Sequence, residues 1–198
     1  MDAVRTCDLT KRFGGKTAVD RFGMRVGKGD IYGFVGRNGA GKTTVMRMLA
    51  GLAEPTDGEA RVFGASPEEA GTARRIGVLI EHPGLYGSMS AYDNLMMKAL
   101  ALGLVGPKGK SRELLEFVGL GQVGRMKAKR FSLGMKQRLG LALALLGDPD
   151  LLLLDEPLNG LDPEGAQEVR RLIMQLNDQR GVTVVVSSHA LEQLGRMA

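Results

Sequence analysis

The first third of the chain alternates apolar and polar residues or carries short apolar runs, a pattern that favours β-strands. The strands that we predict here span residues 4–9, 17–26, 31–35 and 59–63. Residues rich in Gly, Pro and Asp separate them, so turns are expected at 10–15, 27–30 and 54–58. One helix is predicted in this region, at residues 42–50. The chain is therefore expected to begin as a strand-rich unit.

Beyond residue 83 the apolar positions recur at helical spacing, and no strand is predicted up to about residue 130. Helices are expected at 90–102 and 111–118, and Gly119, Gly121 and Gly124 follow as stop signals. We expect this stretch to form a helical lobe at about 83–130, inserted between core segments 1–82 and 131–198. All of it would belong to one domain, 1–198.

Three short apolar runs, at residues 76–80, 151–154 and 182–186, are typical of strands buried on both faces of a parallel sheet. One helix is predicted before the run at 151–154, at residues 135–146. Another is predicted between the runs at 151–154 and 182–186, from Asp162-Pro163 to about residue 177. Asp162 is a good N-cap, and proline is favoured at the first helical position. The fold class predicted is α/β, with a mostly parallel sheet core and an antiparallel β part.

The segment between the strand at 31–35 and the helix at 42–50 matches the pattern G-x-x-x-x-G-K-[ST]. Its residues are Gly36, Arg37, Asn38, Gly39, Ala40, Gly41, Lys42 and Thr43, and Thr44 follows. The glycines leave backbone N–H groups open to phosphate oxygens, and the helix dipole faces the same anion. Lys42 would reach the β and γ phosphates, and Thr43 offers a hydroxyl to Mg²⁺. A Gly-rich turn that contains Lys and Thr by chance is the alternative.

Carboxylates follow two of the buried strands. Glu81 comes after 76–80, and the adjacent Asp155 and Glu156 come after 151–154. Open α/β sheets bind ligands at this end of their strands. Two neighbouring acids are unfavourable there unless cations or hydrogen bonds satisfy them. Asp155 could hold Mg²⁺ through water, and Glu156, on the opposite side, could orient or deprotonate an attacking water; a polar strand end that caps the next turn is the alternative.

Two further residues are candidates for contact with a nucleotide. His189 follows Ser187 and Ser188 at the end of the strand at 182–186, where it could donate to a γ-phosphate. On its own it would be interpreted as a structural histidine. Phe13 ends the first strand and turn, and its ring could either fill the core or stack on a base. The sequence position leaves both interpretations of Phe13 open.

Composition is that of an ordinary globular protein, with 43% hydrophobic and 25% charged residues in 198. The longest apolar run, at 139–146, is far shorter than the roughly 20 residues that cross a bilayer, and the first residues show no apolar signal region. We expect the protein to remain where it is made. Cys7 is the single cysteine, which agrees with a reducing cytoplasm.

The formal charge of +5 and the pI near 9.5 suit nucleic acid, an anionic membrane face or a nucleotide. A basic cluster is formed by Arg125, Lys127, Lys129, Arg130, Lys136 and Arg138. It is accompanied by one aromatic residue, Phe131, and so lacks the stacking platforms of a single-strand binder. We interpret it as a solvated surface, and no nucleic-acid partner is expected.

Together these motifs, from Phe13 to His189, resemble the ATP-binding subunit of ABC transporters, a P-loop NTPase family. Residues 36–43 are similar to its Walker A motif, 151–156 to Walker B, and 158–162 to the D-loop. His189 takes the place of the switch histidine, and Phe13 that of the adenine-stacking aromatic. At 131–138, where the family carries L-S-G-G-Q, only Ser132 and Gly134 agree at the five core positions, although Lys-Gln-Arg follows as expected.

Glu81 occupies the place of the family's Q-loop glutamine. This acid, the HPGLY segment after it and the SLGMKQR segment at 132–138 resemble the branch that exports bacitracin, lantibiotics and other amphipathic compounds through separate membrane subunits. The resemblance implies a metal site of Thr43, Glu81 and Asp155. It implies catalytic roles for Lys42, Glu156 and His189.

The resemblance also implies partners and a place in the cell. Two such subunits, identical or different, would close head to tail around two ATP molecules, and Ser132 and Gly134 would contact the partner's nucleotide. Hydrolysis of Mg²⁺-bound ATP would drive multi-span membrane permeases, so the protein would be cytoplasmic and peripheral on the inner face of the cell membrane. The transported compound is selected by the permease and is not encoded here.

Two other functions are compatible with the motifs. A soluble ABC ATPase that acts on ribosomes or DNA would usually carry two nucleotide domains or a long coiled-coil insertion, and neither is found in this sequence. A non-hydrolysing nucleotide-binding scaffold is suggested by the divergent signature and by the chain's end nine residues after His189. The family usually continues with further strands and a helix, so we expect the usual C-terminal end to be lacking.

Overall fold

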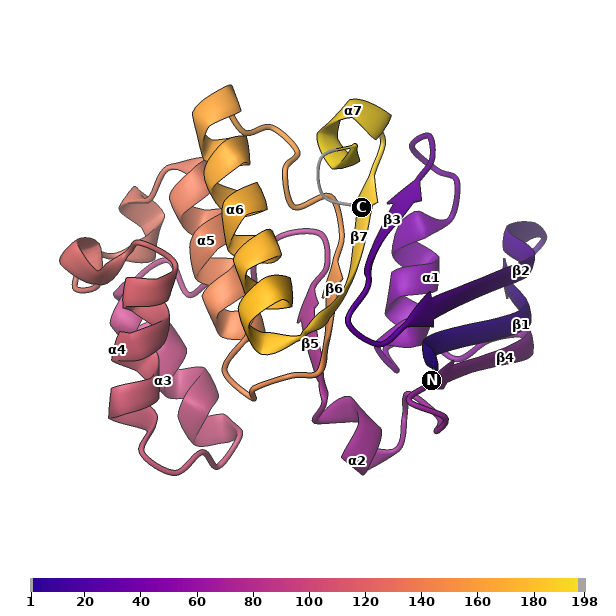
Figure 1. Ribbon diagram of the computed structural model, residues 1–198, viewed down its shortest axis with the longest axis horizontal. Helices are drawn as coiled ribbons and strands as arrows, with labels where there is room; N and C mark the ends of the chain where they lie inside the picture. The colour runs from indigo at the N-terminus through magenta and orange to yellow at the C-terminus, as the bar shows by residue number, and fades with distance from the viewer. Residues whose placement is uncertain (1, 196–198) are drawn as a thin grey trace.

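The computed structural model describes residues 2–195 and contains one parallel sheet, one antiparallel sheet and helices around them (Figure 1). The strands are β1 (Asp2–Phe13), β2 (Lys16–Gly27), β3 (Ile31–Val35), β4 (Asp57–Val62), β5 (Ile76–Leu79), β6 (Leu151–Leu154) and β7 (Thr183–Ser188). The α-helices are α1 (Lys42–Leu49), α2 (Ala70–Ala73), α3 (Ala91–Ala101), α4 (Pro107–Phe117), α5 (Leu133–Ala144), α6 (Pro163–Arg180) and α7 (Leu191–Leu194), and the 3₁₀ turns are η1 (Gly121–Val123) and η2 (Ala128–Arg130). The α/β class predicted from the sequence is confirmed.

The parallel sheet has the strand order β3-β7-β6-β5, and its two inner strands, β6 and β7, are buried along their whole length, whereas β3 and β5 at its edges are partly exposed. Leu151 and Leu153 of β6 pack with α1 and the antiparallel sheet, whereas Leu152 and Leu154 pack with the helices on the other face. All four side chains are fully buried. The run of leucines therefore has the double burial that its lack of alternation predicts.

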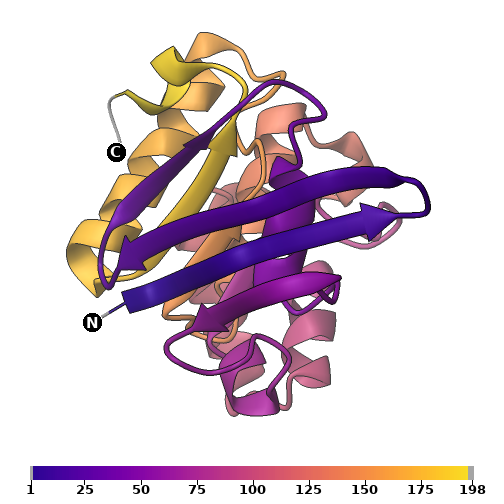
Figure 2. The same ribbon diagram turned by 90° about the vertical axis from the view of Figure 1, so that its right-hand side faces the viewer.

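Helix α1 lies between the two sheets. The antiparallel sheet, with the order β2-β1-β4, crosses over α1 on the side away from β6, as the two views show (Figures 1 and 2). Val4 and Val26 of this sheet share one core with Met46 and Leu49 of α1 and with Leu153 of β6. Apolar layers therefore enclose α1 on two sides and hold the helix between the sheets.

Residues 83–130 are all described, and they contain no strand beyond an isolated bridge between Ser90 and Lys127. Helices α3 and α4 pack beside α5, on the far side of α5 and α6 from the sheet (Figure 1). Ion pairs join α4 to the rest: Lys110 Nζ lies 2.6 Å from an oxygen of Asp148, and Arg180 Nη2 lies 3.2 Å from Glu113. The predicted helical lobe is thus joined to the core by ion pairs between α4 and residues of the core.

The first hairpin differs from its prediction. Residues 10–13 were expected to turn, but β1 continues through Phe13, which pairs with Lys16, so that only Gly14 and Gly15 connect the strands. Likewise β4 begins at Asp57, inside a predicted turn, because Asp57 pairs with Thr10. Pairing to neighbouring strands overrides the local turn composition here. Helix α2 was not predicted at all.

Other boundaries move by a few residues. Helix α4 begins at Pro107 rather than near residue 111, helix α6 continues to Arg180, and β7 extends through Ser187 and Ser188. The interpretation of the basic cluster as solvated does not hold for Arg138. Its side chain is largely covered, donates to the carbonyl of Val118 at 3.3 Å and lies 3.6 Å from Glu168. Arg138 therefore connects α5 to the elements on either side.

Within residues 2–195, no helix combines the length and the apolar character that a membrane span requires.

Candidate functional site

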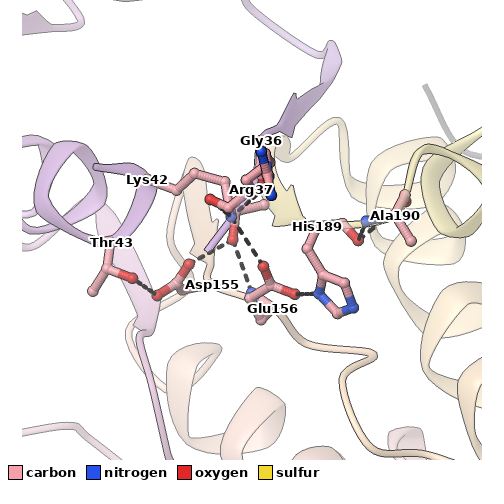
Figure 3. Close-up of polar contacts among 10 residues, drawn as sticks. Gly36, Arg37, Lys42, Thr43, Asp155, Glu156, His189 and Ala190 are labelled. Carbon is pink, nitrogen blue, oxygen red and sulfur yellow. Dashed lines mark hydrogen bonds and ion pairs between the residues drawn. The ribbon is translucent and has the colours of Figure 1, made fainter. Parts of the chain in front are cut away.

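The register of the parallel sheet brings three chain segments to one edge. Val35 of β3 is paired with Ser188 of β7, and Leu154 of β6 is paired with Val186 of β7. The residues that follow these strands therefore emerge side by side, and the N–H of Gly36 donates to the carbonyl of Ser188 at 3.2 Å. Figure 3 shows the result: side chains from the start of α1, from the end of β6 and from the end of β7 point toward one another, and the loop before α1 lies beside them.

Strand β2 packs against the loop at residues 36–43. Gly41, the residue before α1, has φ = +87°, and a Cβ there would lie 2.5 Å from the carbonyl oxygen of Ala18. Glycine is therefore the residue that this position accepts without displacing β2. The four residues between Gly36 and Gly41 are exposed, and Gly39 among them has a positive φ of 80°. The loop is therefore packed against β2 at Gly41 and exposed to solvent at residues 37–40.

Lys42 is the buried cation of the site, with 6% of its surface exposed. Its Nζ donates to the carbonyls of Gly36, at 2.6 Å, and Arg37, at 3.2 Å, and lies 3.3 Å from Oε1 of Glu156 (Figure 3). The ammonium group is thus enclosed by acceptors from the loop and by one carboxylate. It sits where an anion bound in the loop would meet a fixed positive charge.

Asp155 is almost completely buried, yet both of its carboxylate oxygens are hydrogen-bonded. Thr43 Oγ1 donates to Oδ2 at 2.6 Å, and Ser187 Oγ donates to Oδ1 at 2.5 Å. The same Ser187 Oγ accepts the backbone N–H of Glu156 at 2.9 Å. A hydroxyl and a carboxylate in contact beside a phosphate-type loop are the oxygen donors that Mg²⁺ prefers, so these residues fit that ion.

Glu156 turns away from Asp155 and has different partners. Its backbone φ is +50°, in the left-handed region that non-glycine residues rarely adopt. Its Oε2 lies 2.7 Å from Nδ1 of His189, whereas its buried Oε1 faces Lys42 and makes no hydrogen bond (Figure 3). One oxygen of Glu156 is therefore held by the histidine, and the other has acceptor capacity to spare.

Phe13 does not fill the core. Its ring is 56% exposed, and the ammonium of Lys11 lies 5.3 Å from the ring centre. It lines a hollow of about 360 Å³ together with nine other residues from β2, the loop, α1 and the end of β6, including Asn38 and Thr44. The structure therefore removes the core-filling alternative for Phe13 and places the ring beside the phosphate-type loop.

Glu81 lies apart from the other candidate metal ligands. Its Oε1 is 2.6 Å from Nη2 of Arg47, in the last turn of α1, and both side chains are about half exposed. Glu81 lines a second hollow, of about 520 Å³, between β5 and the helices of the lobe. In the described part of the chain, no three His, Cys, Asp or Glu side chains are grouped as a metal site. The structure brings Thr43 and Asp155 together and does not bring Glu81 to them.

Ser132 and Gly134 stand at the beginning of α5. Ser132 is its N-cap, accepting the N–H of Met135 at 3.2 Å. A Cβ on Gly134 would make only an ordinary contact of 3.8 Å with Leu161, so packing within this chain does not require glycine there. Neither residue lines the hollow at Phe13 and Lys42. Ser132 is exposed, and Gly134 is partly exposed.

Two residues of this region had no role in the sequence analysis. Ser187 was noted only as part of a strand end, and Arg47 was not singled out. A polar residue at the buried end of a strand beside Asp155 was the signal available for Ser187. No sequence signal marked Arg47, because its pairing with Glu81 depends on how α1 is rotated against β5.

Comparison with known proteins places these features in a family. The family model described as ABC transporter matches residues 19–159. The chain is 47% identical over 196 residues to the bacitracin transport ATP-binding protein BcrA of Bacillus licheniformis, covering 98% of this chain and 64% of BcrA. It is 42% identical over 191 residues to the lantibiotic transport ATP-binding protein SrtF of Streptococcus pyogenes, covering 96% of this chain and 82% of SrtF.

A solved structure has the same fold. It is the ADP conformation of MJ1267, an ATP-binding cassette of an ABC transporter, which superimposes with a TM-score of 0.88 at 23% identity and covers 100% of this chain and 85% of MJ1267. The chain spans just under two thirds of the length of BcrA. The extent of the family match, together with the identity to SrtF over most of that relative, shows that this chain belongs to the ABC transporter family.

Proposed function

We propose that this chain is the ATP-binding and ATP-hydrolysing subunit of an ABC exporter, driving membrane subunits that export a drug, a peptide antibiotic or another amphipathic compound. The observation that carries the proposal is the convergence of Lys42, Thr43, Asp155, Glu156 and His189 at the carboxyl edge of one parallel sheet. The names of the relatives, for bacitracin and lantibiotic transport, support the exporter branch.

The hollow beside Phe13 would bind the nucleotide, with Phe13 on the base and the loop at residues 36–43 on the phosphates. The exposed ring of Phe13 can stack on adenine, and backbone N–H groups of the loop and of the start of α1 would bind the phosphates. Lys42 would exchange its contacts with the loop carbonyls for the β and γ phosphate oxygens. Thr43 and Asp155 would hold Mg²⁺, which would neutralise phosphate charge. Glu81 would join them only after leaving Arg47.

Hydrolysis follows from the two oxygens of Glu156. His189 holds Oε2, so Oε1 is the atom that would accept the proton of an attacking water. The water's oxygen would then bond to the γ phosphorus as the bond to the leaving ADP oxygen breaks. His189 would orient Glu156 and contact the γ-phosphate. These roles for Glu156, His189 and Lys42 remain proposals, as do all the site assignments.

A second copy, identical or different, would complete each site. Ser132 is exposed and Gly134 partly exposed at the N-terminus of α5, an arrangement that suits contact with a phosphate bound by a partner. Leu133 between them is 45% exposed, although it is a large apolar residue. Both observations support a head-to-tail pairing in which this chain supplies the beginning of α5 to the other subunit's nucleotide.

The membrane subunit would dock in the hollow at Glu81. This hollow lies between β5 and the lobe, and Tyr86 and Met97 expose apolar surface there. Lys98 adds a cation at the same place, and burial lowers its pKa. A permease segment with apolar and acidic side chains fits this surface.

The protein would then act in the cytoplasm, peripheral on the inner face of the membrane, with the lobe at about 83–130 as the part that moves.

The test measures Mg²⁺-dependent phosphate release by the purified protein, alone and with a membrane protein encoded beside it. Glu156→Gln should reduce release by about 100-fold or more, and Glu59→Gln, at an exposed glutamate in β4, should not reduce it. Co-purification with the membrane protein supports the exporter. Absence of ATP binding would overturn the proposal. ATP binding without hydrolysis, both for the protein alone and with the membrane protein, would favour the alternative of a non-hydrolysing nucleotide-binding scaffold.

A further inference from the structure

The hydroxyl of Ser187 contacts both acids of the site. Ser187 is on β7 and its surface is 0% exposed. Its Oγ accepts the N–H of Glu156 and donates to Oδ1 of Asp155. We propose that Ser187 is a positioning residue that assigns Asp155 to the metal and Glu156 to the attacking water. This inference rests on the proposed ATPase function.

The direction of the two hydrogen bonds is fixed by the number of protons. A backbone N–H can only donate, so Oγ must be its acceptor, and the single hydroxyl proton remains for Asp155. Asp155 Oδ2 receives a second proton donor, the hydroxyl of Thr43. The carboxylate of Asp155 therefore lies between two hydroxyls and has one orientation. If Thr43 turns toward a metal, the bond from Ser187 still holds Asp155 in place.

The effect on Glu156 comes through its backbone. Glu156 has φ = +50°, and this unusual conformation directs its side chain to His189 rather than along the path of β6. The N–H that Ser187 accepts belongs to the same residue, so the hydroxyl helps to hold the turn. Without it, a buried N–H would lose its partner. The chain would then gain from relaxing toward ordinary φ values, which would move Glu156.

The strand's composition makes a purely apolar residue the expected choice at position 187. Val184, Val185 and Val186 precede it, and all are fully buried. A hydroxyl in such a place is unfavourable unless its hydrogen bonds are made, and here both partners belong to the catalytic acids. Filling space would not require an oxygen. The hydroxyl is therefore explained by Asp155 and Glu156.

The test compares Ser187→Ala with Ser187→Thr and with Thr183→Val. Thr183 lies on the same face of β7, is 1% exposed, and its hydroxyl accepts the N–H of Gly29 at 3.0 Å. Thr183→Val therefore controls for loss of a buried hydroxyl away from the acids. Two quantities are measured: amide hydrogen exchange at Asp155 and Glu156 without nucleotide, and the Mg²⁺ concentration that gives half-maximal binding of a fluorescent ATP analogue.

For Ser187→Ala we expect faster exchange of the Glu156 amide and an increase of about tenfold in the Mg²⁺ concentration required, as is usual when a residue supporting a metal ligand is removed. Ser187→Thr, which keeps the hydroxyl, should restore both values toward wild type. In an Asp155→Asn background, Ser187→Ala should change the Mg²⁺ requirement much less than it does in wild type.

The inference is overturned if Ser187→Ala leaves both measurements unchanged, or if Thr183→Val changes them as much. Failure of the proposed function has a different signature. In that case wild type would bind the ATP analogue no better than Lys42→Ala, or would bind it without any dependence on Mg²⁺.

Discussion

The carboxyl edge of the parallel sheet and the first turn of α5 both carry residues predicted to contact ATP, but they differ in how they are built. At the sheet edge Lys42, Asp155 and Glu156 are buried or nearly so, and each is held by contacts from another strand or loop. At α5, Ser132 bonds only to the N–H of its own helix, and Leu133 is exposed.

This difference separates the residues that act within one chain from those that, in the proposed pairing, would act on a second subunit's nucleotide. The dense contacts at the sheet edge fix reacting groups before any ligand arrives, which is how proteins prepare a site for charged chemistry. The beginning of α5 has an ordinary helix cap and no further support. In the proposed pairing, this surface would contact a second subunit, so substitutions in the two regions should have effects of different kinds.

The largest effect is expected for Lys42→Ala. Removing the buried ammonium eliminates charge-assisted hydrogen bonds to two phosphates, which corresponds to a loss of roughly 100-fold or more in ATP affinity. Titration with a fluorescent ATP analogue measures it. Lys127→Ala, which removes an exposed lysine of the lobe, is the control. Binding of the analogue to Lys42→Ala at wild-type affinity would contradict the role of the loop.

Glu156→Gln should reduce hydrolysis by about 100-fold or more while ATP still binds, because an amide cannot accept the water's proton. A closed ATP-bound dimer should then accumulate, which size-exclusion chromatography in ATP and Mg²⁺ detects. The prediction fails if turnover is unchanged, or if the variant remains monomeric at saturating ATP.

Ser132→Ala tests the other region, with Ser90→Ala as its match. Both serines cap the helix that follows them, so each substitution should lower the free energy of unfolding by about 1 kcal/mol. Only Ser132→Ala should also reduce ATPase activity, by about tenfold, through loss of a hydrogen bond to the partner's nucleotide. ATP binding by the monomer should not change. If Ser132→Ala and Ser90→Ala reduced ATPase activity equally, the proposed contact between the start of α5 and the second subunit's nucleotide would be contradicted.

The smallest effect is expected for Glu81→Gln. A carboxylate repels the phosphates wherever Mg²⁺ is absent, so wild type should require Mg²⁺ for ATP binding more steeply than the glutamine variant. The ion pair with Arg47 is half exposed, and pairs of this kind are weak, so we expect a difference of about two- to threefold. The permease's stimulation of ATPase should change as well. Identical Mg²⁺ titrations and identical stimulation would reduce Glu81 to a solvated acid.

Patterns that depend on neighbours in sequence predicted most of the strands and helices. The leucine run at β6, the glycine loop and the Asp162-Pro163 helix start have one local solution each, and the structure has all three. Residues 10–13 were mistaken for a turn because their local composition favours one, whereas they pair with the neighbouring residues 16–19 of β2 and, at Thr10, with Asp57 of β4, far along the chain. The sequence could not supply that pairing.

The candidate site shows the same division. That Lys42, Asp155 and His189 meet at one sheet edge followed from the rule that parallel strands place ligand groups at their carboxyl ends. The partners of individual side chains did not follow. The pairing of Glu81 with Arg47 and the double contact of Ser187 depend on strand order and helix rotation, and no spacing in the sequence encodes these.

The four leucines of β6 also affect how the protein unfolds. Since Leu151 and Leu153 belong to one apolar cluster and Leu152 and Leu154 to the other, the strand cannot leave either cluster without exposing the residues it contributes to both. Val184, Val185 and Val186 of β7 divide in the same way. The two halves of the molecule are thus thermodynamically linked through the middle of the sheet, and heat or denaturant should melt them in one cooperative transition.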